Sequence, residues 1–160
     1  IYYALDYTIP PTWFNEGHAM MFEAVELDHR KEVLEVEENE PRVKLLEKIL
    51  EDNKVNLLPI MRLSGRQFYQ EQSLAANYAL SWGLVYFLRK AHPQYPEAGY
   101  DKVCNRVYQT LVKTRDWRKA TEAGIAAVDT GRLHKDFLDF WSSNSKRRKA
   151  ERYEIFREKR

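Results

Sequence analysis

Apolar residues recur along this chain mainly at spacings of three and four, which is the period of an amphipathic helix rather than the strict alternation of a strand. The stretch 74–90 is apolar nearly all round, so we expect a helix there that lies at the centre of the fold. The pattern predicts a mainly α protein, an orthogonal multi-helix bundle. Further helices are expected from Pro41 to about residue 53 and over residues 99–114, 117–128 and 133–157.

The first helix is predicted to begin after the pair Pro10-Pro11. Thr12 suits the N-cap position because its hydroxyl can accept a hydrogen bond from a free backbone N–H. We expect this helix to run to about Leu27, and the charged stretch 28–39 either continues it or frays. A connector at Leu58-Pro59 and a turn at Ser64-Gly65 are expected to separate the next helices.

The composition is that of a chain with one core, because 44% of its 160 residues are hydrophobic. Lys and Arg total 26 against 24 Asp and Glu, and a net charge of +2 gives no field that argues for a nucleic-acid partner. We therefore expect one helical unit over residues 1–145 and a basic helical tail over residues 146–160, whose charges most simply face solvent.

Compartment and topology are only weakly constrained by the sequence. Cys104 is the single cysteine, so an intrachain disulfide is excluded. No apolar run approaches the roughly 20 residues that a membrane-spanning helix needs. The chain begins at Ile1 without a basic leader, so we expect no signal peptide and the loss of upstream sequence.

Glu16 is the residue with the most unusual position. On a helical wheel it lies one turn from Trp13 and one turn from Met20, which places a carboxylate on the apolar face. Burying a charged carboxylate without a partner costs several kcal/mol, so Glu16 needs a cation, a cluster of donors or a metal. Gly17 costs about 1 kcal/mol relative to Ala within a helix, and a close backbone approach would explain it. The alternative is an ordinary first-turn Glu that the helix dipole stabilises.

Other polar residues of this helix have simpler interpretations. Glu23 follows Glu16 by seven residues and returns to nearly the same face, so it is a candidate to support a ligand. Asn15 can bond a substrate backbone or cap the helix start, and capping is the simpler role. His18 points away from Glu16 by about 200° at roughly 100° per residue, so we assign it no zinc role. The chain's other histidines, His29, His92 and His134, likewise have no partner at the i+4 position.

The segment Thr12-Trp13-Phe14-Asn15-Glu16-Gly17-His18-Ala19-Met20-Met21-Phe22-Glu23 resembles the Trp-Leu-Asn-Glu-Gly-x-Ala-x-Tyr-x-Glu motif of gluzincin zinc metallopeptidases. The first Glu of that motif is the third zinc ligand, so the resemblance implies a metal-binding role for Glu16. From about residue 8 to 141 the order of motifs looks like that of the bacterial family called domain of unknown function 1570. The resemblance also implies that Tyr78, on a later helix, hydrogen-bonds the developing oxyanion, whereas its alternative role is that of a core tyrosine.

The sequence departs from the family pattern in one respect that bears on activity. In that family the motif follows a His-Glu-x-x-His helix, which supplies two zinc ligands and the general base, and this sequence has no such pair. The resemblance thus implies the C-terminal helical lobe of a zincin-like peptidase domain, inactive as this fragment, with zinc and a peptide or protein substrate bound only by the full-length protein. A bacterial origin would allow export to the periplasm or medium.

Two alternatives stay open, a degenerate peptidase scaffold and a non-catalytic helical interaction module. Met20-Met21 in place of the usual small-plus-Tyr pair leaves room for the first. If the chain is half of a site, apolar surface around Trp13, Glu16 and Met20 should be exposed, and self-association is then expected.

Overall fold

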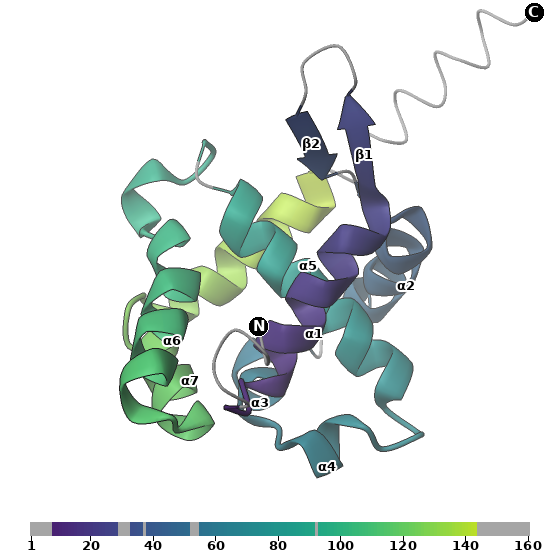
Figure 1. The fold of residues 1–160 in the computed structure, drawn as a ribbon. Helices are drawn as coiled ribbons and strands as arrows, with labels where there is room; N and C mark the ends of the chain where they lie inside the picture. The colour runs from purple at the N-terminus through teal and green to yellow at the C-terminus, as the bar shows by residue number, and fades with distance from the viewer. Residues whose placement is uncertain (1–7, 29–32, 37, 52–54, 92, 144–160) are drawn as a thin grey trace, which may run out of the picture.

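The structure is a computed structural model that describes residues 8–28, 33–36, 38–51, 55–91 and 93–143. Helices dominate this part of the chain and pack as a multi-helix bundle, as the spacing of the apolar residues predicts (Figure 1). No helix within it is long and apolar enough to cross a bilayer. The helices are α1 (Thr12–Met21), α2 (Glu40–Glu51), α3 (Leu57–Arg62), α4 (Gly65–Phe68), α5 (Leu74–Lys90), α6 (Asp101–Thr114), α7 (Trp117–Ile125) and an unlabelled helix over residues 130–143, with 3-10 turns η2 (Phe22–Ala24) and η3 (Pro96–Ala98).

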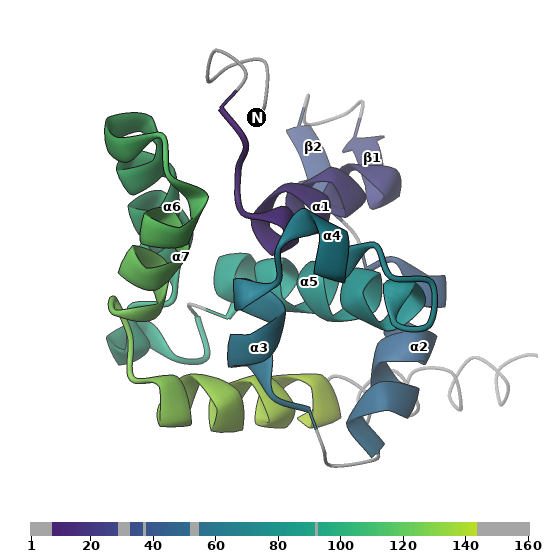
Figure 2. The ribbon, with the colours of Figure 1, turned by 90° about the horizontal axis from the view of Figure 1, so that it is seen from below.

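Helix α5 forms the centre of the bundle. All residues from Ala79 to Leu88 are buried, so the helix is covered on every side along its second half. Figure 2 shows it in the middle, with α1 above it and α2 below. The near-continuous apolar character of residues 74–90 therefore predicted both its limits and its central place.

Helix α1 lies directly against α5, and the two helices approach closely at Gly17. A Cβ atom added to Gly17 would lie 2.5 Å from Cγ2 of Val85 and 2.6 Å from the carbonyl oxygen of Ser81. The predicted close approach at this glycine is confirmed. Because Gly17 fixes α1 on α5, it also fixes the position of the preceding residue, Glu16, relative to α5.

The large aromatic residues join α5 to the helix over residues 130–143. The rings of Trp82 and Trp141 have centroids 5.3 Å apart, and both side chains are buried. Trp13 is also fully buried. The buried hydroxyl of Tyr100 donates to Oδ2 of Asp136 at 2.7 Å, which pairs two polar groups within this aromatic region.

The start and end of α1 differ from the prediction. Pro11 occupies the N-cap position and its carbonyl accepts from the N–H groups of Phe14 and Asn15, so Thr12 is the first helical residue. The helix ends at Met21 instead of near Leu27.

After η2 the chain forms an antiparallel hairpin of β1 (Val25–Asp28) and β2 (Val33–Val36), in which Leu27 lies opposite Leu34. Figure 1 shows these strands projecting from the end of α1. The expectation of a continued or frayed helix is therefore wrong for residues 33–36. Only β1 alternates apolar and charged residues, over four positions, and β2 does not alternate. This strand period is too short to outweigh the helical pattern around it.

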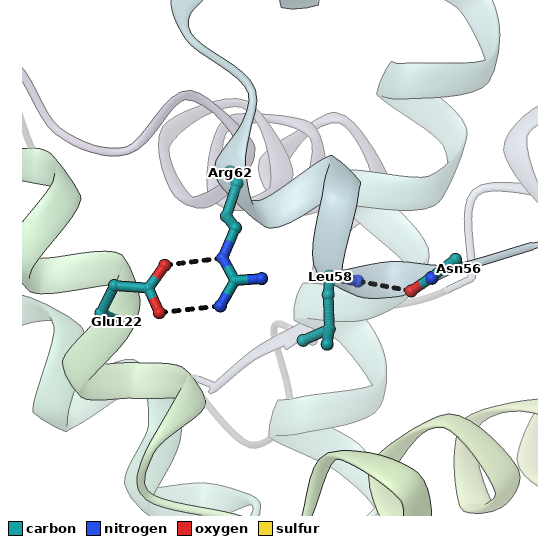
Figure 3. Close-up of polar contacts among 4 residues, drawn as sticks. All are labelled: Asn56, Leu58, Arg62 and Glu122. Atoms are coloured by element: carbon teal, nitrogen blue, oxygen red, sulfur yellow. Dashed lines mark hydrogen bonds and ion pairs between the residues drawn. The ribbon is translucent and has the colours of Figure 1, made fainter.

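Two segments expected to be irregular are helical. Residues at Leu58-Pro59 belong to α3, where Pro59 is the third residue and needs no intrahelical donor. Asn56 caps this helix by accepting from the N–H of Leu58 at 3.1 Å (Figure 3). The expected turn at Ser64-Gly65 is the start of α4, with a capping box between Ser64 and Gln67.

Helices α6 and α7 form a hairpin beside the rest of the bundle (Figure 1). An exposed ion pair connects α3 to α7 (Figure 3). Nε and Nη2 of Arg62 lie 2.6 and 2.8 Å from the two carboxylate oxygens of Glu122. Helix α7 ends at Ile125 instead of Val128. The expected continuation of the last helix to residue 157, and the basic tail over 146–160, lie outside the described residues.

Candidate functional site

The carboxylate of Glu16 lies half-buried on α1 and is held by donors from two parts of the chain. The hydroxyl of Tyr69 donates to Oε1 at 2.8 Å, and Nδ2 of Asn15 donates to the same oxygen at 3.2 Å. Neighbouring Trp13 and Met20 are buried, so Glu16 does sit beside the apolar face. Donors and partial exposure together offset the cost of placing a carboxylate there.

The burial of Trp13 and Met20 overturns one expectation. Exposed apolar surface around these residues was the reason to expect self-association, and their exposed fractions are only 0% and 3%. The large apolar side chains that are exposed at the two ends of α1 are those of Ile9 and Phe22. The premise for self-association at the Trp13 surface is therefore wrong.

Tyr78 comes from α5 and lies next to Glu16. Burial raises the pKa of the Tyr78 hydroxyl, and the negative charge of Glu16 and a hydrogen bond with it raise it further. The guanidinium of Arg42, whose Cζ lies 5.7 Å from the centre of the Tyr78 ring, acts in the opposite direction. A raised pKa keeps the hydroxyl protonated at neutral pH, so Tyr78 remains a hydrogen-bond donor beside the carboxylate.

Tyr69 is the site residue that sequence reasoning did not identify. It follows α4 directly and is half exposed, and burial of its hydroxyl together with the bond to Glu16 raises its pKa well above the ordinary value. The position of Tyr69 depends on α4, since Nδ2 of Asn77 donates to the carbonyl of Phe68 at 2.8 Å and ties the end of α4 to α5. The Ser-x-x-Gln capping box at residues 64–67 is the one sequence signal for this short helix.

Asn15 and Glu23 have environments different from those expected. Asn15 lies inside α1 and donates to Glu16, so the simpler role of capping the helix start is wrong. Glu23 lies in η2 beyond the end of α1, and the seven-residue helical spacing to Glu16 does not apply there. Its carboxylate is exposed, accepts from Nδ2 of Asn39 at 3.2 Å and lies 3.8 Å from Nη2 of Arg42.

A surface cavity of about 170 Å³ opens at Glu16. It is bounded by residues that precede α1, by α1 itself, by α4 with Tyr69, and by the first residue of α7, Trp117. The carboxylate is thus open to a small group that enters from solvent. The residues that line the cavity are Ile9, Pro10, Thr12, Asn15, Glu16, Gly65, Tyr69 and Trp117.

The described residues supply one candidate metal ligand at this cavity. Within the described ranges, no group of three His, Cys, Asp or Glu side chains is arranged to hold a metal ion. A zinc ion would need further ligands in addition to Glu16. The residues at this cavity therefore fit zinc as the source of one carboxylate in a larger ligand set. His29 and His92 lie outside the described residues, and His134 is half-buried on the last helix.

His18 faces away from Glu16, as its place on the wheel predicts. Its Nδ1 lies 2.7 Å from the carbonyl oxygen of Phe14, and its Nε2 lies 2.9 Å from Nη2 of Arg89. The carbonyl requires a proton on Nδ1, and the guanidinium requires a lone pair on Nε2, so these contacts fit the neutral ring. Burial, followed by the positive charge of Arg89, lowers the pKa of His18 to about 4.

Comparison with known proteins identifies a family. The model of the family described as "Protein of unknown function (DUF1570)" matches residues 7–106. The matched segment includes α1 with Glu16, Tyr69 and Tyr78, and it ends within α6, before Trp117. No curated protein and no solved structure matches the chain.

Proposed function

Because the chain belongs to the family DUF1570, and because Glu16 and Tyr69 of its matched segment line one cavity, we propose that it forms the helical part of a zinc metallopeptidase site. Glu16 is then the carboxylate ligand. Two imidazoles and a general base come from a His-Glu-x-x-His helix in a longer polypeptide or a second chain. The observation that carries this proposal is the oriented carboxylate, with Tyr69 and Asn15 on its Oε1 and Tyr78 beside it.

The chain's own residues have distinct roles in such a site. Peptide-bond hydrolysis needs a Lewis acid that polarises the carbonyl and a water molecule that is activated as a nucleophile, and zinc supplies both functions when bound. Tyr69 and Asn15 hold the Glu16 carboxylate in one orientation, as partners of ligating carboxylates do in metal sites. Tyr78 stays protonated and can donate to the oxygen of a peptide carbonyl as negative charge develops there.

The contact at Gly17 connects these roles. Glu16 belongs to α1 and Tyr78 to α5, and the two helices meet at the glycine that follows Glu16. A rigid contact between the two elements keeps the carboxylate and the hydroxyl in a fixed relation, which a preorganised site requires.

A degenerate scaffold without activity is the second candidate, and one observation favours it. The Glu16 carboxylate already accepts hydrogen bonds from Tyr69 and Asn15 of its own chain, so it has a stable environment without a metal. The two candidates differ in whether the full-length protein holds zinc.

Metal content of the full-length gene product decides between the two candidates. We expect about one zinc ion per chain in the wild type and its loss in Glu16→Gln, a variant of similar size that is a poor zinc ligand. Glu23→Gln is the matched control, because Glu23 is an exposed carboxylate near the end of the same helix, and it should keep its zinc. Zinc retained in Glu16→Gln would refute the ligand role, and a metal-free wild type would favour the scaffold.

A further inference from the structure

A second cavity, of about 310 Å³, opens between α3 and α7. Trp117 lines both this cavity and the one at Glu16, so the two hollows adjoin at this residue. Trp117 and the other α7 residues lie beyond residues 7–106, the segment that the family model matches. The residues that line the second cavity are Arg62, Trp117, Arg118, Thr121 and Glu122.

The charges in this lining leave one cation in excess. Arg62 is paired with Glu122 through Nε and Nη2, which neutralises both groups. Figure 3 shows the third guanidinium nitrogen of Arg62 pointing away from Glu122. The guanidinium of Arg118 instead lies over the ring of Trp117, with its Cζ 4.5 Å from the ring centre. A cation stacked on an aromatic face keeps its N–H groups available at the ring's edge for an anion.

Thr121 gives a second, independent observation. Its side chain is 1% exposed, and its Oγ1 has no hydrogen-bond partner in the part of the chain that the structure describes. Buried polar atoms nearly always have a partner, so the unpaired hydroxyl of Thr121, a residue of this lining, points to a ligand atom that completes it.

We propose that this second cavity, the Arg118 pocket, binds a carboxylate of a peptide that also occupies the cavity at Glu16. The carboxylate is either an Asp or Glu side chain or the peptide's C-terminal group, since both present two oxygens to a guanidinium. An extended peptide advances roughly 3.3 Å per residue, so residues next to the one at Glu16 reach an adjoining hollow. The inference rests on the proposed function only in treating the bound peptide as a substrate.

Binding to the full-length gene product tests the pocket without any turnover. We would titrate the protein, in the presence of a zinc chelator, with acetylated peptides of one neutral sequence by isothermal calorimetry. The first peptide carries a central Glu and a C-terminal amide. The second has Gln in place of that Glu and keeps the amide, and the third has the same Gln with a free C-terminal carboxylate. We expect at least one carboxylate peptide to bind roughly tenfold more tightly than the Gln amide.

Variants assign that preference to the pocket. Arg118→Gln should abolish it, because it removes the cation and keeps a similar length of side chain. Lys119→Gln is the matched control: it removes the same charge from the next residue of α7, which does not line the cavity, and the preference should remain. Preference for the Glu peptide identifies a side-chain subsite, and preference for the free terminus identifies a carboxypeptidase-type subsite.

The outcomes separate this inference from the proposed function. No preference for a carboxylate, or equal losses in the Arg118 and Lys119 variants, would overturn the pocket even if the protein holds zinc. An Arg118-dependent preference in a protein that never holds zinc would support the pocket as a peptide-binding site and reject the peptidase.

Discussion

Replacement of Gly17 by Ala tests whether the contact between α1 and α5 is as close as the structure shows. The added methyl group would meet both Cγ2 of Val85, at 2.5 Å, and the backbone oxygen of Ser81, at 2.6 Å. A side chain can change rotamer, but the Ser81 carbonyl belongs to the central helix, so α1 as a whole must move away. Overpacking of this kind costs about 1–3 kcal/mol. Alanine recovers about 1 kcal/mol of helix propensity. Because the clash is with backbone, the cost should lie in the upper part of that range, about 2–3 kcal/mol, and the net loss should be about 1–2 kcal/mol.

The assay is urea unfolding followed by circular dichroism, with thermal melts as a second measurement. For a chain of this size, each kcal/mol lowers Tm by roughly 2–4 °C. The matched control is Gly65→Ala, because a Cβ there has its nearest neighbours, Oγ1 of Thr12 and Cε2 of Tyr69, at 3.8 Å. We expect it to be neutral or slightly stabilising. Equal effects in both variants, or a Gly17→Ala protein as stable as the wild type, would refute the close contact.

Two further predictions concern single polar groups. The pKa of His18 is lowered from 6.5 to about 4, so the unfolded chain binds the proton more readily between these values, and stability should fall by up to about 3 kcal/mol as pH drops from 6.5 to 4. The urea midpoints of wild type and His18→Gln are compared at pH 7 and at pH 4.5, so that the titration of carboxylates, which is common to both proteins, cancels. A difference between the two proteins that is the same at both pH values would contradict the prediction. Asp116 accepts from the N–H groups of Arg118 and Lys119 at the start of α7, so Asp116→Ala should lose about 1 kcal/mol in the same assay, whereas Asp116→Asn, which keeps an acceptor, should lose little.

The parts of the fold that the sequence predicted are those determined by local pattern. The limits of α5 follow from an apolar run that only a central helix can bury, and the contact at Gly17 follows from the cost of glycine within a helix. The place of Glu16 beside the apolar face of α1 follows in the same way from its spacing to buried neighbours.

The parts that the sequence did not predict depend on contacts between distant segments. Tyr69 reaches Glu16 across 53 positions, and nothing near either residue specifies that bond. Trp117 lines the cavity at Glu16 from a helix still further along the chain. The hairpin of β1 and β2 consists of four-residue strands that are too short to stand out from the helical spacing around them, and cross-strand pairing decides their structure.

The enclosed position of α5 has a consequence for how the molecule opens. Residues 79–88 are covered by helices from both ends of the chain, so their amide hydrogens cannot meet solvent through fraying or through the loss of a single neighbour. Amides of this kind exchange with deuterium only when the cooperative unit as a whole opens. The slowest-exchanging amides of α5 therefore measure the free energy of global unfolding directly.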